Sequence, residues 1–185
     1  MKTKMTAADL MHGVDYSGQN VDGWLVQEKF DGLRALWTGK ELVSRNGQKF
    51  NAPAWFVAKL PECPLDGELY AGRGMLSRIS TRLARWKSGD DEDWADVRFK
   101  VFDAPSVAGG YLARWQSCFT WLPQTSFHIQ LCTIRTLEAK GIESLRKDLK
   151  ELQADGGEGF ILRHPDAPYI AGRTDKMLKF KDANR

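Results

Sequence analysis

The sequence predicts an α+β fold in which antiparallel sheets are flanked by helices. Two observations lead to this prediction. Short runs rich in β-branched and aromatic residues are separated by glycine-containing turns, and one longer segment has helical periodicity. These segments do not alternate regularly, as they would in a parallel βαβ sheet. A chain of 185 residues is long enough for one substantial core. No repeat or linker divides it, so we expect a single domain over residues 1–185.

Three apolar runs define the expected strands in the first part of the chain. Residues 24–30 (WLVQEKF) have the pattern of a buried strand. Residues 33–48 (LRALWTGKELVSRNGQ) predict two strands joined around residues 38–40, because apolar and β-branched residues flank a Gly-containing turn. Residues 97–105 (VRFKVFDAP) predict another strand, which is ended by Pro105.

An amphipathic helix is expected over residues 141–155. Its apolar residues recur at helical spacing with charges on the opposite face, and they are Ile142, Leu145, Leu149 and Leu152. The segment that follows, residues 157–163 (GEGFILR), predicts a strand. We expect Glu158 to lie on this strand.

Charge and cysteine content limit the classes of function. The formal net charge of +3 is too small to identify a nucleic-acid partner by itself. The three cysteines, Cys63, Cys118 and Cys132, are far apart, so neither a disulfide framework nor a Cys-x-x-Cys metal site is indicated. The first residues have no apolar signal-peptide core, and no later segment approaches membrane-spanning length. We therefore expect a cytoplasmic protein with no membrane partner. We also expect a monomer.

The hexapeptide KFDGLR, residues 29–34, is the strongest candidate for a chemical site. It places a lysine before an Asp-Gly pair and ahead of an arginine, inside an otherwise apolar run. In isolation the same pattern also describes an edge-strand lysine followed by an ordinary turn. Later segments favour a chemical site: LDGELY carries two carboxylates, VFDAP has an aromatic before an aspartate, GGEG has a glutamate, and MLKFK has alternating lysines.

This order and spacing resemble nucleotidyltransferase motifs I, III, IIIa, IV and V of the ATP-dependent DNA ligases. The matching segments are EKFDGLRA (28–35), SR (44–45), PLDGEL (64–69), VFD (101–103), GGEG (156–159) and GR (172–173) before MLKFK. The resemblance covers almost the whole chain and is closest to the minimal bacterial and viral enzymes. It implies an α+β nucleotide-binding domain, which agrees with the elements expected above.

The resemblance implies that Lys29 is the nucleophile. It would attack the α-phosphate of ATP, form a lysyl-AMP phosphoramidate and release pyrophosphate. An ordinary lysine has a pKa near about 10.4 and is protonated at neutral pH, so the site must favour the neutral amine. Nearby cations have this effect. Lys179, Lys181 and a bound divalent metal, Mg²⁺ or Mn²⁺, are the expected sources.

The remaining ATP-binding roles follow from the resemblance position by position. Gln27 matches the residue that reads the adenine edge, and an amide can both donate to that edge and accept from it. Phe102 matches the aromatic that stacks on the base. Arg34 and Glu68 match the pair that contacts the ribose. Three further residues support the motifs: Asp31, Gly32 and Asp66.

A second group of residues is expected around the phosphates. Glu158 matches a metal-site carboxylate, and Mg²⁺ is commonly held by one or two carboxylates together with substrate phosphates. Lys179 and Lys181 are two residues apart on an expected strand, so both side chains would face one side and meet one phosphate group.

Nicked double-stranded DNA is the macromolecular partner that the resemblance implies. Arg45 and Arg173 match positions that contact the 5′-phosphate or backbone at a nick, and a guanidinium can bind two phosphate oxygens at once. The stretch of residues 72–89 is also basic, with Arg73, Arg78, Arg82, Arg85 and Lys87. It suits a DNA backbone, and a solvated helix face is the other open interpretation.

The sequence ends at Arg185, directly after the last motif, so we expect the C-terminal OB domain of the family to be absent from this chain. Self-adenylation would then survive and nick sealing would be poor. Two alternatives stay open: an RNA ligase or capping-type nucleotidyltransferase, and a non-catalytic nick- or nucleotide-binding module. The segments SRNG and GRTDKMLKFK favour a DNA ligase.

Overall fold

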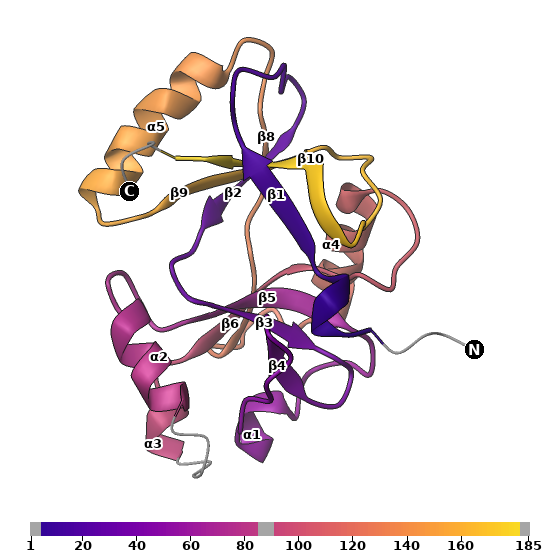
Figure 1. Ribbon diagram of the computed structural model, residues 1–185, viewed down its shortest axis with the longest axis vertical. Helices are drawn as coiled ribbons and strands as arrows, with labels where there is room; N and C mark the ends of the chain where they lie inside the picture. The colour runs from indigo at the N-terminus through magenta and orange to yellow at the C-terminus, as the bar shows by residue number, and fades with distance from the viewer. Residues whose placement is uncertain (1–4, 85–90, 182–185) are drawn as a thin grey trace.

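The computed structural model describes residues 5–84 and 91–181 (Figure 1). A short 3-10 helix, η1 (Ala7–Asp9), precedes the first strand. The strands are β1 (Met11–Asp15), β2 (Leu25–Lys29), β3 (Leu33–Trp37), β4 (Leu42–Ser44), β5 (Leu65–Tyr70), β6 (Arg98–Asp103), β7 (Ile129–Leu131), β8 (Arg135–Thr136), β9 (Gly159–Arg163) and β10 (Gly172–Phe180). The helices are α1 (Ala54–Val57), α2 (Leu76–Ala84), α3 (Asp91–Trp94), α4 (Tyr111–Trp121) and α5 (Ile142–Ala154).

The strands form two five-stranded sheets, one above the other in Figure 1. Sheet A has the order β1-β10-β9-β2-β8, and sheet B has the order β4-β3-β5-β6-β7. The pairs β1·β10 and β6·β7, each at one edge of its sheet, are parallel. The other pairs are antiparallel. The predicted α+β class with antiparallel sheets and flanking helices is therefore confirmed.

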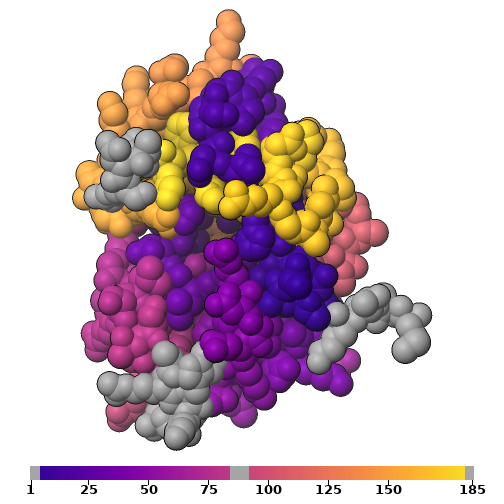
Figure 2. Space-filling view, in the orientation of Figure 1, coloured from indigo at the N-terminus to yellow at the C-terminus, as the bar shows by residue number. Residues whose placement is uncertain are grey.

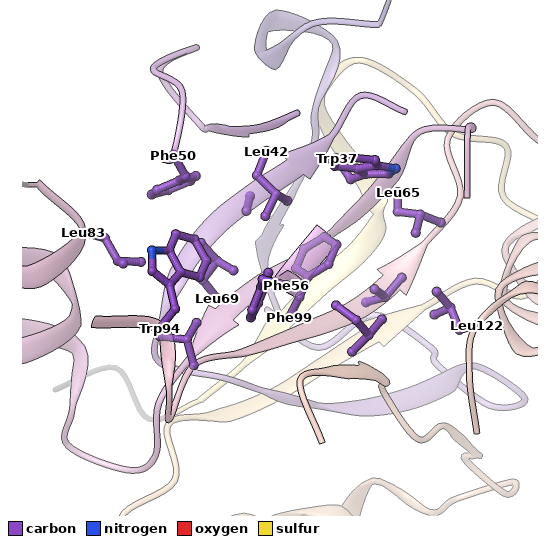
Figure 3. Packing of buried hydrophobic residues seen from close by; sticks show 14 of the residues in the cluster. Trp37, Leu42, Phe50, Phe56, Leu65, Leu69, Leu83, Trp94, Phe99 and Leu122 are labelled. Atoms are coloured by element: carbon purple, nitrogen blue, oxygen red, sulfur yellow. The ribbon is translucent and has the colours of Figure 1, made fainter. Parts of the chain in front are cut away.

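Each sheet has its own hydrophobic core. In sheet B, Trp37, Leu65, Leu69 and Phe99 pack with side chains of the lower helices, including Phe56 of α1 and Trp94 of α3 (Figure 3). In sheet A, α5 contributes Leu145 and Leu149, which pack with Val26, Leu162 and Leu178. Burial of these apolar side chains is the main stabilising term for both halves. The predicted amphipathic helix is confirmed.

The predicted strands correspond to β2, β3 with β4, β6 and β9, and two details are wrong. Glu158 does not lie on a strand, because β9 begins at the next residue, where Gly159 pairs with Lys29 at the end of β2. The ladder stops there because the chain leaves sheet A directly after Lys29. Similarly, Lys181 lies just beyond β10, whereas Lys179 lies within it.

The Asp-Gly pair of the first motif is the link between the two sheets. It joins the end of β2 in sheet A to the start of β3 in sheet B. A Cβ atom on Gly32 would lie 2.3 Å from the backbone oxygen of Leu69 in β5, so a side chain has no room. The motif therefore sets the crossover that places Lys29 where the two sheets meet.

Two of the five basic residues in the stretch after β5 pair with carboxylates of the protein. Arg73 lies 3.1 Å from a carboxylate oxygen of Glu28, and Arg82 lies 2.6 Å from Asp96. Arg78 is exposed. Arg85 and Lys87 lie outside the described residues. Across residues 5–84 and 91–181, no helix combines the length and apolar character that a membrane span requires.

Candidate active site

A cleft of about 290 Å³ lies where the two sheets meet. The surface is hollowed between the upper and lower halves of the molecule (Figure 2). Residues from both sheets line the cleft. Those that the sequence predicted are Gln27, Lys29, Arg34, Arg45, Glu68, Phe102, Arg173 and Lys179. These side chains come from segments spread from β2 to β10, so the fold brings the separated motifs into one place.

The amine of Lys29 lies at the end of β2 and is partly exposed to the cleft. It forms an ion pair and hydrogen bond with Glu158. The other carboxylate oxygen of Glu158 lies 3.7 Å from the amine of Lys181. Neither Glu158 nor Lys181 lines the cleft itself. Lys181 contacts Glu158, and Glu158 contacts Lys29, which does line the cleft. Glu158 is therefore a carboxylate shared by two lysines.

Arg34 is held by Asp66 rather than left free in the cleft. Its Nε and Nη2 each donate to a different oxygen of Asp66, both at 2.6 Å. Tyr169 donates to the same carboxylate at 2.6 Å, and Arg34 also donates to the carbonyl of Met11 in β1 at 3.2 Å. This network connects β3 and β5 of sheet B to β1 of sheet A. Asp66 thus fixes the guanidinium at the cleft wall.

Glu68 lies opposite Arg34 in the β3–β5 register and lines the cleft. Burial raises the pKa of Glu68 to about 7, although the positive charges of Arg34 and Lys29 act in the opposite direction. The negative charges of Asp66 and Glu158 add to the rise. Burial disfavours the charged carboxylate because its hydration is lost. Glu68 therefore titrates near neutral pH.

Phe102 is almost fully buried in the cleft wall and is contacted by two guanidiniums. The Cζ atoms of Arg34 and Arg163 lie 4.8 and 5.1 Å from its ring centroid. Cation–π attraction of this kind holds a ring in place. Any stacking on a base would use the part of the ring that faces the cleft.

Behind Phe102, a buried carboxylate joins the two sheets a second time. Asp103 accepts from Nε of Arg114 at 2.6 Å and from Nη1 of Arg163 at 3.0 Å. Arg114 lies on α4, and Arg163 lies at the end of β9. Asp103 is also the register partner of Asp66 in the β5–β6 pair. The two buried aspartates therefore connect the sheets from adjacent positions.

Gln27 is 5% exposed and lines the cleft from β2. Its Oε1 accepts a hydrogen bond of 2.7 Å from the hydroxyl of Tyr111, the first residue of α4. Burial raises the pKa of Tyr111 above its ordinary value, so the hydroxyl stays protonated. The predicted base-reading residue is thus already oriented by a partner.

One wall of the cleft is rich in cations. Arg45, Arg173 and Lys179 line it, together with His12 of β1. Burial, followed by the positive charges of Arg34, Arg45 and Lys179, lowers the pKa of His12. The imidazole is therefore neutral at neutral pH, and the surrounding positive charge suits phosphate groups.

The residues around Lys29 fit a metal that is completed by substrate. In the described part of the chain, no group of three or more His, Cys, Asp or Glu side chains converges to hold an ion. Glu158 offers one partly exposed carboxylate next to the amine. Mg²⁺ with one carboxylate and several phosphate oxygens or waters matches this donor set.

Several residues of the cleft and its support were not predicted from the sequence. They are His12, Asp103, Tyr111, Arg114, Arg163 and Tyr169. Asp103 stands within the motif segment VFD, and Arg163 ends the predicted strand that follows GGEG, so the position of each near a motif was an available signal. Tyr111 and Tyr169 stand outside every motif. Asp31 lies in the crossover between the sheets and does not line the cleft.

The known proteins that are similar to this chain in sequence or structure include several DNA ligases. No family model matches the chain. A DNA ligase of Haemophilus influenzae is 34% identical over 179 residues, which are 95% of this chain and 64% of that protein. A solved structure from a structure-function study of DNA binding by Lig E DNA ligases is 33% identical, has a TM-score of 0.85, and is matched over 94% of this chain and 68% of its own.

A more distant structure shows the same fold. The adenylated DNA ligase of Chlorella virus is 19% identical and has a TM-score of 0.74, with 93% of this chain and 66% of that chain covered. This chain therefore spans about two thirds of the length of its relatives. The identity to the Lig E structure and the shared fold together establish the family. The chain belongs to the ATP-dependent DNA ligases, and its two sheets form their nucleotidyltransferase fold.

Proposed function

We propose that residues 1–185 act as a single adenylation domain, in which Lys29 becomes covalently linked to AMP. The observation that carries the proposal is that residues of four separated motifs line one cleft between the sheets, while Glu158 of the fifth motif contacts Lys29 beside it. The amine attacks the α-phosphate of ATP, a nitrogen–phosphorus bond forms, and the bond to the pyrophosphate oxygen breaks. The ammonium loses one proton to solvent before the attack and the nitrogen loses a second one after it, so the phosphoramidate keeps one N–H, and pyrophosphate leaves.

The nucleoside binds at the Gln27 and Phe102 side of the cleft. Gln27 meets the edge of the adenine, and the ring of Phe102 contacts its face. Glu68 accepts from a ribose hydroxyl, with Arg34 beside it and fixed by Asp66. Because these side chains have partners before ATP arrives, little ordering is needed on binding.

The phosphates bind at the cationic side. Lys179 lines the cleft there. Lys181 lies outside the cleft and contacts Glu158, which in turn contacts Lys29. Glu158 would hold Mg²⁺, which neutralises phosphate charge when bound. Glu158 forms an ion pair and a hydrogen bond with the amine of Lys29. The carboxylate must therefore give up that contact before the amine can react.

Nicked double-stranded DNA is the proposed acceptor of AMP. Arg45 and Arg173 are exposed on the rim of the cleft, where a 5′-phosphate could meet both. A second hollow shares Arg34, Arg45 and Glu68 with the cleft. This continuity would give the strand a path to the adenylate. The relatives with which the chain was compared are DNA ligases. The comparison therefore does not favour the alternatives of an RNA ligase, a capping enzyme or a non-catalytic module. Cytoplasmic location and a monomeric state stay predictions.

The test is covalent labelling with ATP carrying a labelled α-phosphate, combined with the intact mass of the protein. The wild-type chain should gain one acid-labile AMP. Lys29→Arg should gain none, because arginine keeps the positive charge but is not deprotonated in proteins. Its unfolding free energy should stay within about 1 kcal/mol of wild type, since the replaced ion pair is partly exposed. Label retained by Lys29→Arg would rule out Lys29 as the nucleophile.

A further inference from the structure

The contact between Tyr111 and Gln27 fixes which atom of the amide faces the cleft. The hydroxyl of Tyr111 donates to Oε1 of Gln27 at 2.7 Å, and both side chains are buried. The reverse pairing, with Nε2 donating to the phenol oxygen, would leave a buried hydroxyl hydrogen without an acceptor, which is costly. The observed pairing therefore leaves Nε2 as the amide atom available to a ligand in the cleft.

The ring of Tyr111 has little freedom to release this contact. The guanidinium carbon of Arg163 lies 4.6 Å from the ring centroid, and that of Arg114 lies 5.8 Å away. Both arginines are bound to the buried carboxylate of Asp103. The direction of the hydrogen bond is thus set by a rigid group outside the cleft.

The geometry points to Tyr111 as a positioning residue that makes the cleft select adenine over guanine. This inference rests on the proposed function, since it assumes that a purine lies against Gln27. Adenine has an acceptor at ring position 1, whereas guanine has an N–H there. A fixed amide N–H can bond to the first and opposes the second. A site with a fixed polar group discriminates strongly against a ligand that leaves it unpaired.

The decisive variant is Tyr111→Phe, which keeps the ring and removes only the hydroxyl. Gln27 can then rotate, so either amide atom can face the base. Equilibrium binding of ATP and of GTP should be measured, together with the concentration dependence of covalent labelling. We expect ATP affinity to fall about three- to ten-fold, the size of one hydrogen bond, and the ATP-to-GTP preference to fall by a similar factor. The labelling rate at saturating ATP should change less than the affinity does.

Two further variants separate positioning from general loosening of the fold. Trp115→Phe removes another donor from α4, the Nε1–H that bonds to the carbonyl of Cys132 at 2.8 Å, and should leave the ATP-to-GTP preference unchanged. In a Gln27→Leu background the amide is absent, so adding Tyr111→Phe should change the preference no further.

The possible outcomes distinguish this inference from the proposed function. Wild-type preference in Tyr111→Phe, or a full effect of Tyr111→Phe in the Gln27→Leu background, would overturn the assignment of Tyr111. Equilibrium binding reports on Tyr111 whether or not label forms. Absence of label from the wild-type chain would therefore count only against the covalent chemistry.

Discussion

Two carboxylates in this protein each contact two cationic side chains, in opposite surroundings. Asp103 is fully buried between Arg114 and Arg163, deep between the sheets. Glu158 lies between Lys29 and Lys181 with 21% of its side chain exposed, next to the cleft. The same arrangement of charges thus occurs once as a fixed connection and once where solvent and ligands can reach it.

The cations differ as well as the burial. A guanidinium stays charged and can bind a carboxylate through two nitrogens, so it suits a permanent contact. An amine can lose a proton and become a nucleophile, and at a partly exposed site its carboxylate can move to another cation. We infer that burial with arginine makes the Asp103 group structural, while exposure with lysine leaves the Glu158 group available for reaction.

Removing the buried charge is the strongest way to challenge this comparison. Asp103→Asn leaves Arg114 and Arg163 without their shared anion in a buried site. The free energy of unfolding should fall by about 3–5 kcal/mol, as measured by chemical denaturation. Asp96→Asn is the matched control, because it also removes a carboxylate paired with an arginine, Arg82, but at a side chain that is 41% exposed. It should cost less than about 1 kcal/mol. Equal losses in the two variants would mean that burial does not distinguish them.

The sequence predicted the reactive group better than the structural one. Lys29, Gly32 and Glu158 belong to short motifs with fixed local spacing, and that spacing can be read without a structure. The hydrogen bonds of Tyr111 to Gln27 and of Tyr169 to Asp66 join residues 84 and 103 positions apart. Such contacts depend on how the sheets pack, which no local pattern records. The motif identifies Glu158, but its exact place just outside β9 depends on packing as well, because β9 begins where β2 leaves sheet A.

Glu68 is neither a fixed structural carboxylate like Asp103 nor a paired one like Glu158. Its ionisation should make the stability of the protein depend on pH. Its pKa is raised from 4.5 to about 7 in the folded chain, so the folded state binds the proton more tightly than the unfolded state. The protein should therefore lose stability as pH rises from about 4.5 to about 7, because stability falls wherever the folded state holds more protons. Below that range both states are protonated, and above it the full cost is present.

Glu68→Gln removes this titration. The difference in unfolding free energy between the variant and wild type should grow in favour of the variant by about 2 kcal/mol from pH 5 to pH 8. This value follows from the linkage between the raised pKa and stability. Denaturant unfolding at several pH values measures it. Glu41→Gln replaces a carboxylate that pairs with Lys49 at the surface and should follow the wild-type curve. Parallel curves for Glu68→Gln and wild type would show that burial does not hold Glu68 in its neutral form.

The smallest effect on stability is expected at Glu158, although activity should suffer. Glu158→Gln removes the charge that Lys29 and Lys181 share, but solvent can reach both amines, so the free energy of unfolding should change by less than about 1 kcal/mol. Self-adenylation should slow by at least about ten-fold at limiting Mg²⁺, because the phosphate charge is less well neutralised.

Glu143→Gln is the control for Glu158→Gln. It removes an exposed carboxylate of α5, paired with Arg146, and should change neither the stability nor the rate of self-adenylation. The measurements are denaturant unfolding and the initial rate of AMP labelling across a magnesium titration. A stability loss as large as that of Asp103→Asn would place Glu158 among the structural groups, and a wild-type rate at limiting Mg²⁺ would remove it from the metal site.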